Sequence, residues 1–345
     1  MRILFYDATP GFSIDRKDTK PCGGILTSLT IIPQYLASKG HEVVVKCTIS
    51  EKQTVNGVEY IPNGLKETMP KWDVIVLNRN GVNHSIVDYS HSIGAKVYWW
   101  LHDIVDFRYL EDSAFKKVDK IIALSEYCKN SYSDFYDIPK DKFVVIPNGA
   151  DTTVFYPGKY EDRKKHHFIM ASALIKGTIP VYDAWMDVKR QFPSATMTIY
   201  SSQALHEKNN SATQKAWLNE MELAGAKVQQ PIPQSILADK MRHAWALLMP
   251  NSYPEICSNL LLQAQACGLP VISSNIGSAS EFIKHNETGI LTEYAPHDLF
   301  LWIKKYSEAV VGLSGDDNRH KFISTQSPKV VKNWKDTGEK WNELF

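Results

Sequence analysis

The residues best suited to chemistry in this sequence lie in the stretch 253–274, which predicts a polar loop, an apolar helix and a buried strand. Glu255 precedes the expected helix, and Gln263 follows eight residues later. At 100° per residue the two positions differ by about 80° after two full turns, so both side chains can project to the same side of the helix start. The free N–H groups and the positive dipole end at Ser258 suit a phosphate. A carboxylate, an amide and an anion-binding helix end together indicate a nucleotide-sugar site.

Further candidate residues follow other expected strands, at the edge where open parallel sheets bind their ligands. Gly23 and Gly24 stand between the first strand and the first helix, where a missing side chain lets the backbone approach a ligand. His102 follows a strand that ends in two Trp residues, and Lys176 stands at a strand–helix junction. By itself a single His is usually structural and a single Lys is usually a solvated surface residue. Both are interpreted as site residues because they follow expected strands.

Short apolar runs alternate with helical or loop stretches throughout the chain, which is the pattern of βαβ units in an open α/β sheet. The first half predicts strands at 3–6, 42–47, 73–77, 96–101, 120–124 and 143–146. The second half predicts strands at 167–171, 196–200, 227–229, 246–249, 270–273 and 289–292. Helices are expected between them at about 179–191, 211–224, 234–243, 258–267 and 278–284. The polar stretch 158–166 is the best linker candidate, so we expect two Rossmann-like domains that face each other across a cleft.

Composition excludes several classes of protein. With 345 residues the chain is long enough for two domains, and a net charge of +1 gives no overall attraction to nucleic acid. The start of the sequence, residues 1–6, predicts a strand and not a signal peptide, and no apolar run approaches the length of a membrane span. The five scattered cysteines indicate reduced thiols, so we expect a cytoplasmic protein.

Ordered partial matches from Gly23 to Gly289 resemble the retaining GT-B glycosyltransferases of family four, also called glycosyl transferases group 1. The pair Glu255 and Gln263 resembles the Glu-x7-Glu signature of that family. The stretch 146–157, Ile-Pro-Asn-Gly-Ala-Asp-Thr-Thr-Val-Phe-Tyr-Pro, and the stretch 277–281, Gly-Ser-Ala-Ser-Glu, match two further family passages. For the Asn-Gly pair we expect a turn with positive φ that sets the passage into the linker.

The resemblance implies a role for each matching residue. Glu255 would act near the transferred sugar and the diphosphate, the residue at 263 would hold the ribose hydroxyls, and His102 would contact the sugar. Lys176 would neutralise the leaving diphosphate. The sequence departs from the family where Gln263 replaces a second Glu, where no Arg accompanies Lys176, and where Ser278 replaces a second Gly. A glutamine amide can still bind a diol, although without charge assistance.

The resemblance therefore predicts a retaining, metal-independent transferase with no cofactor besides its donor, a nucleotide-diphosphate sugar. Residues 1–157 would form the acceptor-side domain, residues 158–327 would bind the nucleotide sugar, and a helix over 328–345 would pack back on the first domain. The acceptor would be a glycan, a lipid-linked molecule or another hydroxyl compound, and the family leaves peripheral contact with a membrane surface open. The predicted catalytic residues are Glu255, His102 and Lys176, and the predicted substrate-binding residues are Gly23, Gly24, Ser125, Ser201, Ser258, Asn259, Leu260 and Gln263.

Two other functions stay open at this point. A nucleotide-sugar-binding protein with little or no activity is consistent with Gln263 and with the missing Arg. An epimerase acting on a sugar nucleotide could share the fold, but it would need additional acid/base carboxylates and His residues in the cleft. A dehydrogenase is disfavoured because no Gly-x-Gly-x-x-Gly follows the first strand.

Overall fold

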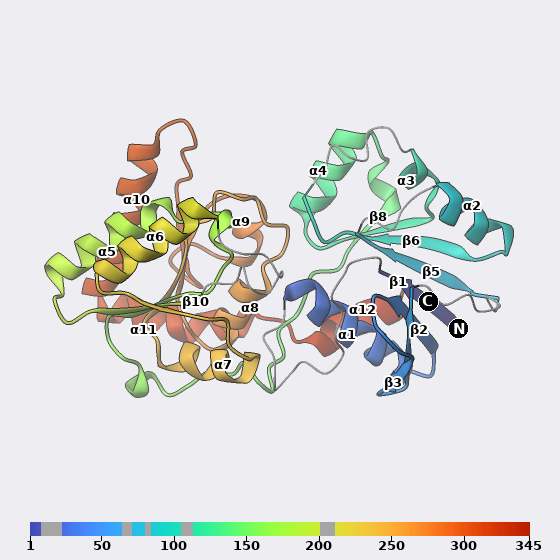
Figure 1. Ribbon diagram of the computed structural model, residues 1–345, viewed down its shortest axis with the longest axis horizontal. Coiled ribbons are helices and arrows are strands. Elements are labelled where there is room, and N and C mark those ends of the chain that lie inside the picture. Colours follow the sequence, from blue (N-terminus) through green and yellow to red (C-terminus); the bar gives the residue numbers. More distant parts are fainter. Residues whose placement is uncertain (8–22, 64–70, 80–83, 105–112, 201–210) are drawn as a thin grey trace. The chain divides into compact units, whose positions relative to one another are not determined.

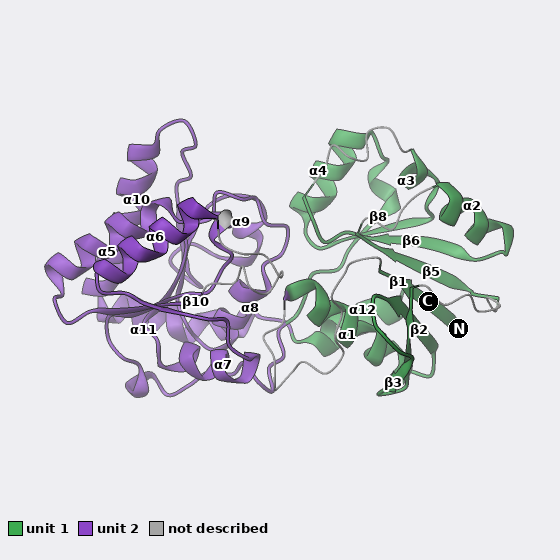
Figure 2. Ribbon diagram, in the orientation of Figure 1, with its two compact units in different colours: residues 1–14, 24–149, 333–345 green, residues 15–23, 150–332 purple. Residues whose placement is uncertain are grey.

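The computed structural model describes residues 1–7, 23–63, 71–79, 84–104, 113–200 and 211–345, and it contains two compact α/β units (Figures 1 and 2). Of the described residues, those within 1–7, 24–149 and 333–345 form unit 1, and Gly23 and those within 150–332 form unit 2. Each unit is built on a largely parallel sheet with helices packed on it, which confirms the expected fold class of two Rossmann-like domains.

The sheet of unit 1 has the strand order β3-β4-β2-β1-β5-β6-β7-β8, and all of its pairings are parallel except that of β3 with β4. The sequence patterns did not anticipate the β3–β4 hairpin, although Asn56-Gly57 is a strong turn signal and both residues have positive φ. The strands are β1 (Arg2–Tyr6), β2 (Glu42–Cys47), β3 (Gln53–Val55), β4 (Val58–Pro62), β5 (Val74–Asn78), β6 (Lys96–Trp100), β7 (Lys120–Ala123) and β8 (Phe143–Val145).

The helices of unit 1 include the last helix of the chain. Gly338 of that helix packs against the ring of Tyr35, and Trp341 contacts the rings of Phe5 and Trp100 at centroid distances of 5.9 and 4.7 Å. These contacts fix the C-terminal segment in the core of unit 1. The helices are α1 (Gly24–Ser38), α2 (His84–Ser92), α3 (Ala114–Lys117), α4 (Glu126–Tyr136) and α12 (Trp334–Asn342).

The chain passes between the units at Gly149–Ala150 and at Lys332–Asn333, whereas the sequence pattern suggested divisions after 157 and 327. The segment after Gly149 belongs to unit 2 because the N–H of Ala150 donates to the carbonyl of Lys332 and Phe155 lies in the core of that unit. Gly149 itself does not have the expected positive φ. Glycine is required there for another reason, since the backbone of Asn333 crosses directly over it.

The sheet of unit 2 has the order β11-β10-β9-β12-β13-β14 and is entirely parallel. Its strands are β9 (His167–Met170), β10 (Thr196–Tyr200), β11 (Lys227–Gln229), β12 (Ala246–Met249), β13 (Val271–Ser274) and β14 (Ile290–Thr292). Its helices are α5 (Ile179–Gln191), α6 (Ala212–Leu223), α7 (Gln234–His243), α8 (Asn259–Ala266), α9 (Ala279–Phe282), α10 (Leu299–Gly315) and α11 (Asp317–Gln326).

Strand β12 shows how this sheet is buried on both faces. Ala246 and Leu248 lie in one hydrophobic cluster, and the alternate residues Leu247 and Met249 lie in the other. This alternation explains why the sequence of the strand is a continuous apolar run. The chain leaves β9 toward β10 on one side and leaves β12 toward β13 on the other, so the two adjacent strands β9 and β12 define the switch point of the sheet.

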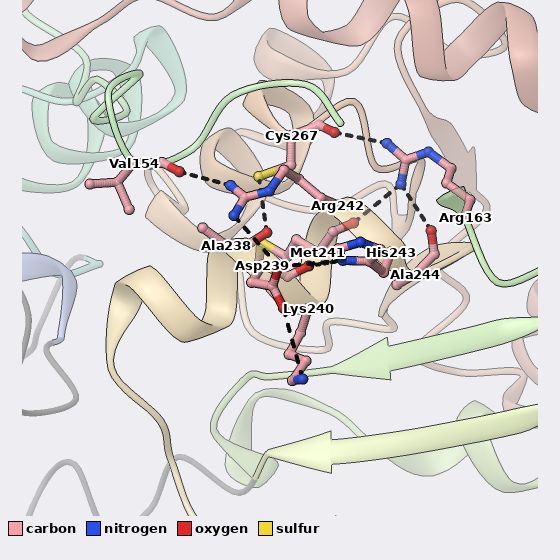
Figure 3. A network of polar contacts seen from close by, with 10 residues as sticks. All are labelled: Val154, Arg163, Ala238, Asp239, Lys240, Met241, Arg242, His243, Ala244 and Cys267. Atoms are coloured by element: carbon pink, nitrogen blue, oxygen red, sulfur yellow. Dashed lines mark hydrogen bonds and ion pairs between the residues drawn. The ribbon is translucent and has the colours of Figure 1, made fainter. Parts of the chain in front are cut away.

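A buried arginine ties together the opposite, N-terminal edge of the same sheet (Figure 3). The guanidinium of Arg163 donates to the carbonyls of Met241, Ala244, Cys267 and Gly268 at 2.7–3.2 Å. Burial lowers the pKa of Arg163 to about 10, which still leaves the group charged at neutral pH. Backbone dipoles thus stabilise a buried charge and hold the segments that lead into β12 and β13.

We predict that Gly149→Ala destabilises the protein. A Cβ at this position would lie 2.6 Å from the carbonyl carbon of Asn333, so one of the two chain segments must shift. Overpacking of this kind costs about 1–3 kcal/mol. The control is Gly315→Ala at the end of α10, where an added Cβ meets nothing within 4 Å. Denaturant titration should show a lower unfolding free energy for the first variant only, and equal values for both variants would contradict the prediction.

Candidate functional site

The candidate site lies at the C-terminal edge of the unit 2 sheet, beside the switch point between β9 and β12. A 3-10 turn over Leu174–Lys176 follows β9 and leads through Gly177 to helix α5. A loop over residues 250–258 follows β12 and leads to helix α8. Ligands bind at switch points of open α/β sheets because the loops on the two sides diverge there. Lys176 and Glu255 stand in these two loops.

Lys176 and Glu255 form an ion pair, with 2.7 Å between Nζ and Oε1. The side chain of Glu255 is 14% exposed and that of Lys176 is 35% exposed. The Lys176 ammonium also lies 5.8 Å from the centre of the Tyr253 ring. The pair is therefore partly shielded from water, so its charges interact more strongly than on an open surface. A carboxylate, a cation and an aromatic face come together at one point.

Backbone hydrogen bonds fix the loop that carries Glu255. The N–H groups of Ser252 and Tyr253 donate to the carbonyl of Lys176 at 2.6 and 3.3 Å. On the other side, the N–H of Ser278 donates to the carbonyl of Glu255 at 2.9 Å, and the hydroxyl of Ser278 donates to the same oxygen at 2.9 Å. The loop is thus held between the segment after β9 and the segment after β13.

Two glycines make this close packing of three backbone segments feasible. Gly177 has a φ of +131°, and a Cβ there would lie 2.2 Å from the carbonyl oxygen of Pro250. Gly277 has a φ of +63°, and a Cβ there would lie 2.5 Å from the carbonyl oxygen of Glu255. Any side chain at either position would push the loop away and would also strain the backbone.

Helix α8 begins at Asn259, four residues after Glu255. The position of Glu255 is consequently set by the loop. The expected angle of about 80° between Glu255 and Gln263 assumed helical spacing of 100° per residue, so it does not apply to this pair. Ser258 is the N-cap residue of α8, and its side chain makes no cap bond to the helix. Gln263 lies in the middle of α8 and is 8% exposed. The helix start at Asn259 and Leu260 and the amide of Gln263 stay predicted ligand groups.

His102 belongs to unit 1 and follows β6. Its ring lies 4.4 Å from that of Trp100, and its Nε2 atom is buried without a hydrogen-bond partner. Burial, and secondly the positive charge of Arg79, lower the pKa of His102 to about 3. Arg79 itself pairs with Asp103 at 2.7 Å. The imidazole is therefore neutral near pH 7, and among the described residues its Nε2 atom has no hydrogen-bond partner.

Three other predicted residues also lie outside unit 2 or outside the described residues. The hydroxyl of Ser125 is buried and accepts the N–H of Cys128 at 3.0 Å, so it caps helix α4. Gly24 is the first residue of α1. Ser201 lies outside the described residues. For these positions, substrate contact stays a prediction.

Gly23 is assigned to unit 2, and a Cβ there would meet nothing within 4 Å. Packing within the described residues therefore does not demand glycine at this position. The predicted close approach of a ligand to the backbone would explain a glycine at this position.

The sequence predicts no role for two residues that shape the site, Ser252 and Tyr253. For Ser278 it suggests that small residues at the start of that helix could donate N–H groups to a phosphate, whereas the N–H of Ser278 donates to the carbonyl of Glu255. Their contacts link residues that are far apart in the sequence, so spacing along the chain gave no signal for them. The glycine at 277 was the one available clue, because a tight backbone approach often requires glycine.

In the part of the chain that the structure describes, no three His, Cys, Asp or Glu side chains come together as a metal site would require. None of the described helices is long and apolar enough to cross a membrane.

Comparison with known families gives two matches. Residues 165–306 match the family described as Glycosyl transferases group 1, and residues 75–154 match Glycosyltransferase Family 4. The alpha-maltose-1-phosphate synthase of Mycolicibacterium smegmatis is 24% identical over 229 residues, which are 61% of this chain and 58% of that protein. The chain spans about half the length of several of the curated relatives it matches.

Solved structures resemble the whole chain in fold. The sucrose-phosphate synthase of Thermosynechococcus elongatus has a TM-score of 0.76 at 15% identity, with 100% of this chain and 98% of that chain covered. The Anabaena protein HepE, solved in complex with UDP and glucose, has a TM-score of 0.74 at 15% identity, with 100% of this chain and 99% of that chain covered. At such identities the likeness concerns the fold.

The low pKa of His102 leads to a prediction about acid stability. An unfolded histidine titrates near 6.5. Since the folded pKa is about 3, the unfolded chain binds the proton first, and the folded state loses stability as the pH falls from about 6.5 toward 3. His102→Gln should remove this loss. As the pH falls from about 6 to about 4, the unfolding free energy of the variant minus that of the wild type should increase by about 1.4 kcal/mol for each pH unit. Parallel pH dependences in denaturant titrations would contradict the neutral, buried imidazole.

Proposed function

We propose that this chain, which belongs to the family 4 glycosyltransferases of the group 1 type, is a retaining enzyme that moves a sugar from a nucleotide-diphosphate sugar to a hydroxyl group of an acceptor. The observation that carries the proposal is the ion pair of Lys176 and Glu255 at the switch point of unit 2. Lys176 supplies positive charge for a diphosphate, and the start of α8 supplies its positive dipole end.

In the proposed reaction, the diphosphate of the donor takes the place of Glu255 as the partner of Lys176. The released carboxylate of Glu255 then binds the sugar. The bond between the sugar C1 and the diphosphate oxygen breaks as the acceptor hydroxyl attacks C1 from the same face, and the departing diphosphate oxygen accepts the hydroxyl proton. Lys176 stabilises the negative charge that develops on the diphosphate, which is the main catalytic requirement of this step. No side-chain nucleophile takes part.

The remaining predicted residues receive supporting roles in the proposal. The Gln263 amide binds the ribose of the donor, and the neutral imidazole of His102 in unit 1 donates a hydrogen bond to a sugar hydroxyl. The position of Gln263 supports this role, because Gln263 lies on helix α8, which follows the loop that carries Glu255. Gln263 is also the observation that favours the second candidate, a nucleotide-sugar-binding protein without turnover, because a neutral amide binds a diol less strongly than a carboxylate does.

A donor panel tests the proposed function. UDP-, GDP- and ADP-sugars are incubated with the full chain and with glycan, glycoside and lipid-linked acceptors, and products are detected by mass spectrometry. UDP-sugars come first because the related HepE structure contains UDP and glucose. The proposal expects a product whose anomeric configuration, read by NMR, equals that of the donor, and expects the same rate in the presence of EDTA. Donor binding without a product would favour the binding protein, and EDTA inhibition that Mg²⁺ reverses would contradict metal independence.

We predict opposite effects on binding and turnover for Glu255→Gln. The variant loses the carboxylate that binds the sugar, so turnover should fall at least about 100-fold, as is usual when a group that acts in the transition state is lost. Affinity for UDP should increase about tenfold, or about 1.4 kcal/mol, because Lys176 no longer has a competing carboxylate beside it. Isothermal titration measures the affinity, with Lys176→Met as the matched variant that should weaken binding. Weaker UDP binding by Glu255→Gln would contradict the proposed exchange of partners.

A further inference from the structure

The hydroxyl of Ser278 makes a hydrogen bond that is unusual for a serine at the start of a helix. Ser278 is the N-cap residue of α9, and a serine at this position normally accepts an N–H from its own helix. Here it makes no such cap bond. Its Oγ instead donates to the carbonyl oxygen of Glu255 at 2.9 Å, alongside the N–H of the same residue. Ser278 is 2% exposed, so water does not compete for these bonds.

The two bonds act on one atom of the backbone at the residue that carries the candidate carboxylate. A carbonyl oxygen has two lone pairs, and both are used here by Ser278. The neighbouring Gly277, with a positive φ, brings this segment close to the loop. On the other side, the carbonyl of Lys176 holds the N–H groups of Ser252 and Tyr253. The backbone at 255 is therefore held from both sides, while the bond that holds the Glu255 side chain among the described residues is its ion pair with Lys176.

We propose that Ser278 is a positioning residue that orients Glu255 for the sugar-transfer reaction. The inference rests on the proposed function, and it adds a residue whose own side chain contacts neither of the charged groups. When the donor diphosphate binds Lys176, the carboxylate of Glu255 loses its ion-pair partner and has to bind the sugar instead. A fixed backbone limits the positions that the released carboxylate can reach. By fixing this backbone, Ser278 restricts the orientations of the released Glu255 side chain.

The test compares two serines whose hydroxyls are bonded in the same way. Ser324 in α11 also donates its hydroxyl to a backbone carbonyl, that of Gly268, at 2.6 Å, and this oxygen likewise has a second donor in Arg163. Ser324 is 8% exposed and lies in the same unit. Ser278→Ala and Ser324→Ala therefore remove equivalent bonds, one at the Glu255 backbone and one at the opposite edge of the sheet. Ser278→Cys, which replaces the hydroxyl by a somewhat larger thiol that is a weaker donor, serves if the alanine variant does not fold.

The measurement is steady-state turnover of the donor identified for the wild type, together with the melting temperature of each variant. We expect Ser278→Ala to lower kcat about 3- to 10-fold, as loss of one hydrogen bond implies, with the donor KM within about twofold of the wild type. Ser324→Ala should lower the melting temperature but leave kcat unchanged. An unchanged kcat for Ser278→Ala, an equal kcat loss in both variants, or a change in KM alone would overturn the inference. A wild type that turns over no donor would instead refute the proposed function.

Discussion

The candidate site of unit 2 depends on one constraint, the packing of loop 250–255 between two neighbouring backbone segments. The carbonyl of Lys176 accepts N–H groups from the loop on one side, and Ser278 donates to the carbonyl of Glu255 on the other. These contacts leave no room for a side chain at Gly177 or at Gly277. The ion pair between Lys176 and Glu255 follows from this packing, because it brings the ends of two strand loops within reach of one another.

Unit 2 handles charge differently at the two edges of its sheet. At the N-terminal edge, the buried guanidinium of Arg163 donates to four backbone carbonyls, three of which, those of Met241, Ala244 and Cys267, are drawn in Figure 3. At the C-terminal edge, Lys176 is partly exposed and pairs with the carboxylate of Glu255. In the proposed function, the pair lies at the switch point so that each member can change partners when a ligand binds.

The sequence predicted the parallel strands well because both faces of each sheet are buried, and continuous apolar runs such as 246–249 report this directly. It failed where geometry depends on distant residues. The glycine at 149 was expected to form a turn with positive φ, but it is required by the backbone of Asn333, which lies far along the sequence. Glu255 was predicted from its type and place, yet the loop that carries it is held by hydrogen bonds to Ser278 and to the carbonyl of Lys176. Residue type thus indicates which groups can react, whereas their arrangement comes from tertiary contacts.

The central claim is that Lys176 exchanges Glu255 for the diphosphate of a nucleotide. Isothermal titration of the wild type and of Lys176→Met with UDP and with UMP tests it most directly, because the two nucleotides differ by the phosphate that Lys176 is proposed to bind. The account predicts that the wild type binds UDP at least about tenfold more tightly than UMP, or about 1.4 kcal/mol, and that this preference nearly disappears in the variant. The same UDP preference in both proteins would show that the second phosphate is bound elsewhere, and would contradict the account.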